Sequence, residues 1–482
     1  MEYTISKARD FRKYIHVAIM FAIMLLFQYI PPVGALTPLG MQTLGIFAGV
    51  VYGWSTLGMI LPSMVGILAF GFLGENTVPA TLATAFGDRI TIILLIFFLI
   101  SSLVEEVGLS NYLAQWCVTR KFVAGKPWGI AIMFCIASAL ISATVNTFAA
   151  MFLMCGIFFN FCEKIGIKPG EKYPMLVTMA ILYCCSVAGA IFPYMGLAIL
   201  VVNQLQTFLG LSINYFLYTL IQLILVTFSL GVYFFIAKYI FRPDTRVILE
   251  NQSQLFEEGV TPLTKHQKIV GGLVLLLILM LFLPEILPET LPLIGFFAGL
   301  DIAGVGIAVL IIYFIIMLDH KDVILVPQLA KTLSWDMIFM FATIAPLSKA
   351  ISNPDADILT FINETMSNLL SGMTPFLFIV AIFILSSIIT QIANNAVVMS
   401  VIGPIMFTLG DMVGANPYVL TVIAAPFLSV AFMTPAGSVP AAMAFSNHKW
   451  IGTKNAYLMG AIIFMINVLM MIVGIPLAEL FF

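Results

Sequence analysis

Long apolar runs separated by short polar stretches dominate the pattern of hydrophobic and polar positions. A helix needs about 20 apolar residues to cross a bilayer. We therefore expect membrane-spanning helices near residues 14–32, 36–54, 57–73, 91–107, 174–205, 211–241, 266–283, 297–317, 336–351, 415–446 and 456–481. Two further apolar blocks, 127–162 and 372–410, are interrupted by polar residues near their centres.

The first interrupted block is predicted to form a re-entrant helical hairpin. Lys126 precedes the block, and Lys164 and Lys168 follow it. Cytoplasmic loops collect Lys and Arg, so the block enters and leaves the membrane on the cytoplasmic side. Split at its polar tip, it offers only about 17 residues per arm, which is short for two crossings and a turn.

The second block is expected to enter from the opposite face. Its flanking stretches, "ISNPDADILTFINETMSNLLSG" and "GDMVGANP", contain no Lys or Arg. With this assignment the N-terminus is cytoplasmic, the C-terminus is outside, and every Lys and Arg except Arg89 and Lys349 lies inside. The apolar run after the basic N-terminal residues lacks a small-residue cleavage site, so we expect it to be retained as the first span.

The two polar tips resemble each other in sequence. "ISATVNTFAAM" (141–151) aligns with "ITQIANNAVVM" (389–399), and the two share a central asparagine. Each tip is followed by a long apolar span with a polar interruption, "CSVAGAIFPYMG" (185–196) and "LSVAFMTPAGSVP" (428–440). Because the tips enter from opposite faces, the two halves have inverted topology. Inverted repeats with broken helices are typical of secondary transporters.

The composition supports this interpretation and excludes several classes of function. The chain is 61% hydrophobic and 9% charged, whereas soluble domains carry about 25% charged residues. We therefore expect an all-α polytopic membrane protein with about 11 transmembrane helices plus two re-entrant hairpins. No basic stretch is dense enough for nucleic acid. The cysteines lack metal-ligand spacing, and the histidines lie near span ends, so we expect neither a metal site nor an enzyme.

The tips could hold an anion without any fixed positive charge. A hairpin tip exposes the N-terminus of its second helix, with free N–H groups and the positive end of the helix dipole. Asn146, Thr147, Asn394 and Asn395 add side-chain donors there. Helix capping alone is the alternative role for the two tip asparagines. A channel would more typically show charged rings or repeated filter loops, whereas two tips from opposite faces suit alternating access.

Other polar residues near these segments have less specific roles. Thr144 and Thr390 are expected to bond to backbone carbonyls of their own helices. Glu105 and Glu106 end the fourth span and serve either a proton relay or the headgroup boundary.

At the tips and breaks the chain resembles the divalent anion/sodium symporter (DASS) family of the ion-transporter superfamily. That family carries Ser-Asn-Thr motifs at the tips of an inward and an outward hairpin, and the matching residues here are "VNT" (145–147) and "ANN" (393–395). The resemblance implies a homodimer that moves dicarboxylates, citrate or sulfate by an elevator movement of a transport domain against a scaffold domain.

The resemblance also implies where the domains and sites lie. The domains are N-terminal scaffold spans at 1–126, a first transport half at 127–241, a cytoplasmic linker at 242–265, second scaffold spans at 266–371 and a second transport half at 372–482. The implied substrate contacts are Asn146, Thr147, Gly189, Pro193, Asn394, Asn395, Thr434, Pro435 and Ser438. The implied sodium ligands are Asn146, Gly189, Asn394 and Ala431.

The chain departs from the family at the hydroxyl groups that help bind sodium. Those positions are occupied here by Ile141, Val145, Ile389 and Ala393. Hard cations need oxygen ligands, so we expect sodium-independent exchange or proton coupling ahead of sodium symport. Sodium symport, with Na+ as the coupling ion, and other permeases of the superfamily remain open. We expect an integral protein of the plasma (inner) membrane whose partners are a small anionic substrate, the lipid bilayer and a second copy of the chain, with no nucleic acid.

Overall fold

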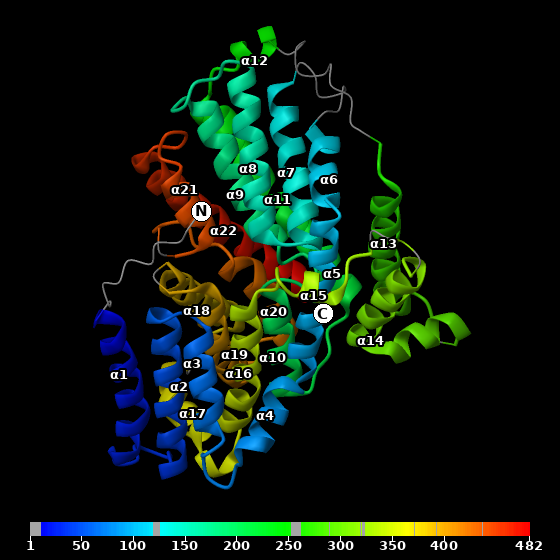
Figure 1. The fold of residues 1–482 in the computed structure, drawn as a ribbon. Coiled ribbons are helices and arrows are strands. Elements are labelled where there is room, and N and C mark those ends of the chain that lie inside the picture. The colour runs from blue at the N-terminus through cyan, green and yellow to red at the C-terminus, as the bar shows by residue number, and fades with distance from the viewer. Residues whose placement is uncertain are drawn as a thin grey trace. The chain divides into compact units, whose positions relative to one another are not determined.

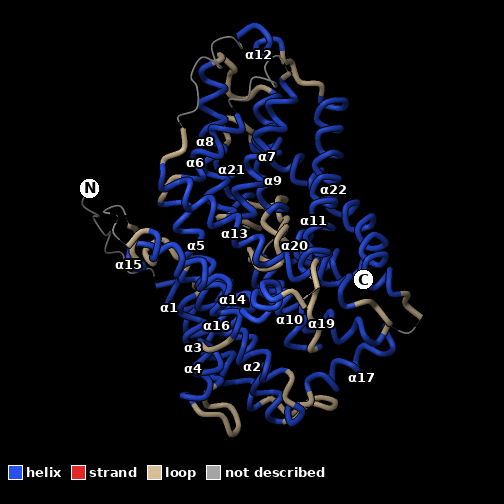
Figure 2. The backbone as a smooth tube through the Cα atoms, turned by 90° about the vertical axis from the view of Figure 1, so that its right-hand side faces the viewer, coloured by secondary structure: helices blue, strands red, loops and turns tan. Residues whose placement is uncertain are grey.

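The computed structural model describes residues 11–118, 126–251, 262–288, 290–318, 320, 323–370, 372–391, 393–435 and 437–482. Within these residues every regular element is a helix (Figures 1 and 2). Eight helices of the described part are long and apolar enough to cross a membrane, or up to nine if α4 (Val78–Phe86) and α5 (Arg89–Glu106) form one bent span. This confirms the predicted all-α polytopic architecture, while the number of crossings stays a prediction.

The helices form two compact units, of which the first comprises residues 1–92 and 334–371. Besides α4, this unit contains α1 (Phe11–Leu26), α2 (Pro38–Thr56), α3 (Ile60–Phe70), α16 (Trp335–Ile351) and α17 (Ile358–Leu370). A Cβ added at Gly45 of α2 would lie 2.4 Å from Phe27, and one added at Gly49 would lie 2.4 Å from Met24. Small residues at this spacing let membrane helices pack backbone against backbone.

The second unit, residues 93–333 and 372–482, holds both hairpins and both broken spans. The hairpins are α7 (Pro127–Thr144) with α8 (Thr147–Lys164), and α18 (Pro375–Thr390) with α19 (Asn395–Met412). The broken spans are α9 (Lys172–Ala188) with α10 (Ala198–Leu209), and α20 (Pro417–Leu428) with α21 (Val439–Ser446). The unit also contains most of α5, α6 (Leu109–Val118), α11 (Tyr215–Phe235), α12 (Arg246–Asn251), α13 (Lys265–Ile286), α14 (Pro292–Ile316), α15 (Val326–Leu329) and α22 (Thr453–Phe481).

The two halves of this unit interlock through the second helix of each broken span. α10, from the first half, packs against α19 and α20 of the second half (Figure 1). In the same way α21, from the second half, packs against α8 and α9 of the first. Each hairpin therefore contacts the broken span of its own half and one helix contributed by the other half.

Buried amide side chains supply hydrogen bonds where prolines interrupt the helices. Pro426 lies inside α20, so the carbonyl of Val422 receives no intrahelical N–H, and Gln222 Nε2 donates to it at 2.7 Å. Pro404 has the same effect inside α19, where Gln204 Nε2 donates to the Ser400 carbonyl at 3.2 Å. An unpaired backbone group costs several kcal/mol in a membrane, so these glutamines allow the prolines to be tolerated.

The division into scaffold and transport domains stays a prediction. α5, α6, α13 and α14, which were expected in the scaffold, group with the hairpins in the second unit. This grouping reflects packing in one conformation, whereas the predicted division concerns which parts move. Of the predicted linker 242–265, residues 252–261 lie outside the described part.

Candidate functional site

Val145 and Asn146 separate the two helices of the first hairpin. The backbone at Asn146 is extended (φ −162°, ψ 131°), and α8 begins at the next residue. Asn146 Oδ1 accepts hydrogen bonds from the backbone N–H groups of Phe148 at 2.8 Å and Ala149 at 3.2 Å. This is the geometry of a helix N-cap. The cap occupies N–H groups that the sequence predicted to be free, and it leaves the Asn146 Nδ2 group as the donor for an anion.

The second tip is capped in the same way. Asn394 precedes α19, and its Oδ1 accepts from the Ala396 N–H at 2.9 Å, while its exposed side chain leaves Nδ2 available. The next residue, Asn395, is half-buried, and its Oδ1 is buried without a hydrogen-bond partner among the described residues. Asn146 and Asn394 are therefore the N-cap residues of the second helix in each hairpin.

The first tip packs directly on the break of its own half. A Cβ added at Gly189, which follows the last residue of α9, would lie 2.4 Å from Thr147 Oγ1. Ser142 Oγ donates to the Cys185 carbonyl at 2.6 Å and also lies 3.0 Å from Thr147 Oγ1. The structure therefore joins predicted residues Thr147 and Gly189. Pro193 is buried in the same break, and no hydrogen bond in the described part joins it to the tip.

The hydroxyl protons at this joint decide what it can bind. Ser142 has one proton, and the carbonyl of Cys185 can only accept. Both contacts are satisfied together when Ser142 donates to Cys185 and Thr147 donates to Ser142 Oγ. Thr147 Oγ1 then presents lone pairs to its surroundings. This arrangement suits a cation or a substrate hydroxyl better than it suits a carboxylate.

The second tip is joined to its break by an amide. Gln391 is 6% exposed; its Nε2 donates to the Ser387 carbonyl at 2.8 Å, and its Oε1 accepts from the Met433 N–H at 2.9 Å. The Thr434 hydroxyl donates to the main-chain carbonyl of Gln391. A Cβ added at Gly437 would lie 3.1 Å from that carbonyl oxygen. Sequence reasoning missed Gln391 and Ser142, because the backbone groups that they bind leave no pattern in the sequence.

The remaining predicted residues of the second break have mainly structural bonds. Ser438 caps α21, since its Oγ accepts from the Ala441 N–H at 3.2 Å and donates to the Ala431 carbonyl at 2.7 Å. That bond reduces the capacity of Ala431 to bind a cation. Pro435 is exposed beside Thr434. Within the described residues no hydrogen bond connects the tip asparagines of the two halves directly.

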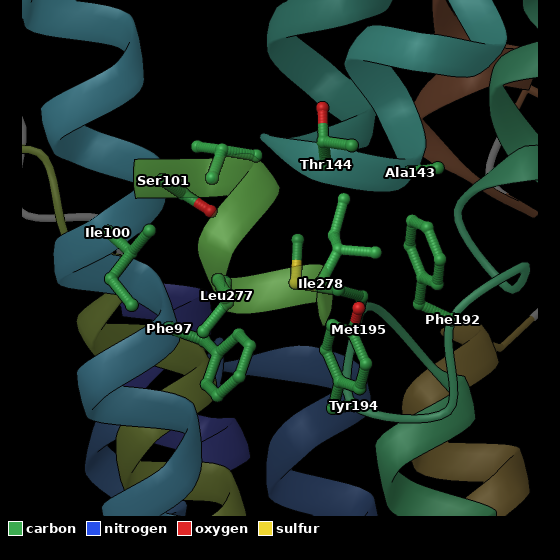
Figure 3. A pocket seen from close by; sticks show the side chains of 11 residues that line it. Phe97, Ile100, Ser101, Ala143, Thr144, Phe192, Tyr194, Met195, Leu277 and Ile278 are labelled. Carbon is green, nitrogen blue, oxygen red and sulfur yellow. The ribbon is translucent and has the colours of Figure 1, made fainter. Parts of the chain in front are cut away.

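A pocket lies beside the first tip. It is lined by Phe97, Ile100, Ser101, Ala143, Thr144, Phe192, Tyr194, Met195, Val274, Leu277 and Ile278 (Figure 3). The hydroxyls of Ser101 and Tyr194 point toward its centre, whereas the Thr144 hydroxyl donates to the Leu140 carbonyl at 2.6 Å, as predicted. The mostly apolar lining of this pocket is unsuited to a doubly charged anion.

Charge is absent from the sequence of both tips and both breaks. Residues 139–151, 185–198, 386–400 and 428–442 contain no Lys, Arg, His, Asp or Glu. In the described part of the chain no cluster of three or more His, Cys, Asp or Glu residues is arranged to hold a metal ion. Any contact that these segments made with an anion would therefore use neutral donors and helix dipoles alone.

The chain matches a known family over most of its length. The family model described as "Citrate transporter" matches residues 9–425. The sodium-dependent dicarboxylate transporter SdcS of Staphylococcus saprophyticus is 25% identical over 419 residues, which are 83% of this chain and 78% of the relative. SdcS of Staphylococcus aureus (strain USA300) is 23% identical over 394 residues, covering 78% and 74%.

A solved structure shares the fold. The crystal structure of the YdaH transporter of Alcanivorax borkumensis superposes with a TM-score of 0.56 at 11% identity, covering 92% of this chain and 98% of that one. At that identity the likeness concerns the fold alone. Because the family model spans most of the sequence, the chain belongs to the citrate transporter family and is a secondary transporter of small organic anions, not an enzyme.

Proposed function

We propose that the protein carries a di- or tricarboxylate across the membrane, coupled to sodium, in the manner of the divalent anion/sodium symporter family. The observation that supports this best is the pair of asparagine-capped tips, Asn146 and Asn394. Each leaves an amide Nδ2 group beside a helix N-terminus in a segment without Lys or Arg. Two such groups suit the two ends of a dicarboxylate, and each helix dipole adds roughly 0.3–1 kcal/mol.

The sodium coupling is supported by the relatives' names and by the first joint. Both relatives are called sodium-dependent dicarboxylate transporters. The joint of Thr147 with Gly189 offers one hydroxyl oxygen with free lone pairs, whereas the Cys185 carbonyl there already accepts from Ser142 Oγ and from the Gly189 N–H. Oxygen atoms of this kind are the ligands that hard cations need.

Sodium-independent exchange is the second candidate function. Apolar side chains at Ile141, Val145 and Ala393 favour it, because they stand where the DASS family places sodium-binding hydroxyls. We also propose that the protein works as a homodimer by an elevator movement, and that Asn395, Thr434 and Pro435 contribute to the site. The resemblance to the DASS family supports these points.

Uptake into proteoliposomes tests the proposal. Radiolabelled succinate and citrate would be added outside with either NaCl or choline chloride, with and without unlabelled anion inside. Uptake that needs a sodium gradient supports symport. Uptake without sodium that needs internal anion supports exchange. If no di- or tricarboxylate showed either gradient-driven uptake or exchange, the proposal would be overturned.

The Asn394→Asp variant separates capping from substrate binding at the second tip. The aspartate oxygen still caps the Ala396 N–H, but it lacks the two amide protons and adds negative charge. We expect a folded protein that has lost uptake. Uptake at the wild-type rate would show that the Asn394 side chain serves only as a cap.

A further inference from the structure

The second hairpin is linked to its break by one buried side chain, Gln391. Its amide is bonded on both sides: Nε2 donates to Ser387 of α18 at 2.8 Å, and Oε1 accepts from Met433 of the break at 2.9 Å. The residue is 6% exposed, so water competes little for these bonds. The side chain thus connects the end of α18 to a loop 42 residues further along the chain.

The main chain at the same residue strengthens this link. The Thr434 hydroxyl donates to the Gln391 carbonyl, which follows the last turn of α18 and accepts no backbone N–H of the described residues. Gly437 lies so close that an added Cβ would be 3.1 Å from that oxygen. Met433, Thr434 and Gly437 of the break are therefore each in contact with one residue of the tip, Gln391.

The first half achieves the same connection differently. There Ser142 of α7 donates to the Cys185 carbonyl at 2.6 Å, and the tip packs on Gly189. A hydroxyl group has one proton and can rotate, whereas a primary amide holds a donor and an acceptor in one rigid plane. In the second half the amide is anchored to α18 through its Nε2 donor, and its Oε1 acceptor holds the Met433 N–H of the loop.

We propose that Gln391 is a positioning residue for substrate binding: its side-chain amide fixes the break that carries Thr434 and Pro435 against the tip that carries Asn394. The proposal rests on the proposed function, since it assigns these segments to the anion site. Gln391 does not touch the anion. It holds the two segments at one spacing, so that their donors and acceptors meet the substrate together.

The test compares substitutions of Gln391 with a matched buried glutamine. Gln391→Met keeps the size of the side chain and removes both bonds, whereas Gln391→Glu keeps an oxygen that can accept the Met433 N–H. Gln204→Met is the control. Gln204 is also a buried amide, 1% exposed, that donates to backbone carbonyls, but those carbonyls belong to Met399 and Ser400, beyond the first turn of α19. Each variant would be purified at equal monodispersity, and KM and Vmax for succinate and citrate would be measured in proteoliposomes.

Substrate affinity is the first measurement. We expect Gln391→Met to raise KM about tenfold, the equivalent of roughly one hydrogen bond, with Vmax per folded transporter within about twofold of wild type. Gln391→Glu should fall between wild type and Gln391→Met, and Gln204→Met should leave KM unchanged. Equal KM values in Gln391→Met and Gln204→Met would overturn the proposal.

A second measurement does not depend on transport. Hydrogen–deuterium exchange of the Met433 amide should be on the order of tenfold faster in Gln391→Met than in wild type, and unchanged in Gln204→Met and Gln391→Glu. Wild-type protection in Gln391→Met would refute the positioning role. If wild type transported no di- or tricarboxylate, the proposed function would fail on its own, and this exchange rate would still decide whether Gln391 holds the loop. If Gln391→Met failed to fold, both measurements would be made on Gln391→Glu. A tenfold higher KM in Gln391→Glu together with a wild-type exchange rate of the Met433 amide would contradict the proposal.

Discussion

Replacing Gly189 with alanine tests whether the first tip and its break form one site. The backbone there (φ −62°, ψ −13°) accepts any residue, so the substitution adds a methyl group without backbone strain. That methyl carbon would lie 2.4 Å from Thr147 Oγ1, where ordinary contact begins at 3.4 Å. The hydroxyl and the methyl group would overlap by about 1 Å, and one of them must move.

The overlap gives the expected size of the effect. Thr147 is β-branched and restricted in a helix, and rotating its hydroxyl would break the 3.0 Å contact with Ser142. A tip displaced by about 1 Å can lose on the order of 100-fold in rate, while overpacking costs roughly 1–3 kcal/mol of stability. We therefore expect Gly189→Ala to raise KM for succinate by roughly 10- to 100-fold.

A double-mutant cycle provides the assay. Gly189→Ala would be measured in wild type and in Thr147→Ala, which removes the clashing hydroxyl. KM from proteoliposome uptake and Tm of the purified protein would both be recorded. Gly231→Ala in α11 is the control, because no atom lies within 4 Å of its added Cβ, and a helical Gly→Ala change alone stabilises by roughly 0.5–1 kcal/mol.

The cycle has one clear result that would refute the reasoning. We expect the rise in KM and the fall in Tm caused by Gly189→Ala to be much smaller in the Thr147→Ala background. Equal changes in the two backgrounds would mean that Gly189 and Thr147 do not contact each other in the functional protein.

Three further predictions concern the first tip, the amide–proline pairs and the topology. Asn146→Asp should keep the helix cap and the Tm but abolish succinate uptake, and retained uptake would restrict Asn146 to capping. Gln222→Leu should lower the free energy of unfolding by about 1–3 kcal/mol, because the buried Val422 carbonyl loses its donor. Adding Pro426→Ala should restore much of that free energy by returning a backbone N–H to this carbonyl, and no recovery would contradict the pairing of Gln222 with Pro426. Single cysteines at Gly166 and Met412 should react with a membrane-impermeant maleimide from opposite compartments, and labelling from one side would disprove the inverted topology.

The sequence predicted the parts of the site that depend on local pattern. The polar tips, the tip asparagines and the breaks in the two long spans all follow from polar residues inside apolar runs, where few such residues are tolerated. The bonds of Thr144 and Thr390 to their own helices followed from the same rule. These features need only neighbouring residues to be recognised.

Features that depend on distant contacts could not be predicted. Gln391 binds the backbone N–H of Met433, and every residue except proline carries such a group, so no sequence signal marks the partner. The crossed packing of α10 on α19 and of α21 on α8 likewise depends on how apolar surfaces meet in space. Apolar residues in membrane helices face lipid and protein alike, which removes the usual signal of burial.

The crossed packing has a consequence for how the protein is made. When the ribosome has completed α10, the helices α19 and α20 that cover it have not yet been synthesised. The first half therefore remains incompletely packed in the bilayer until the C-terminal part has been inserted. A gene divided within 242–265 should yield working transporter only when both fragments are produced in the same cell.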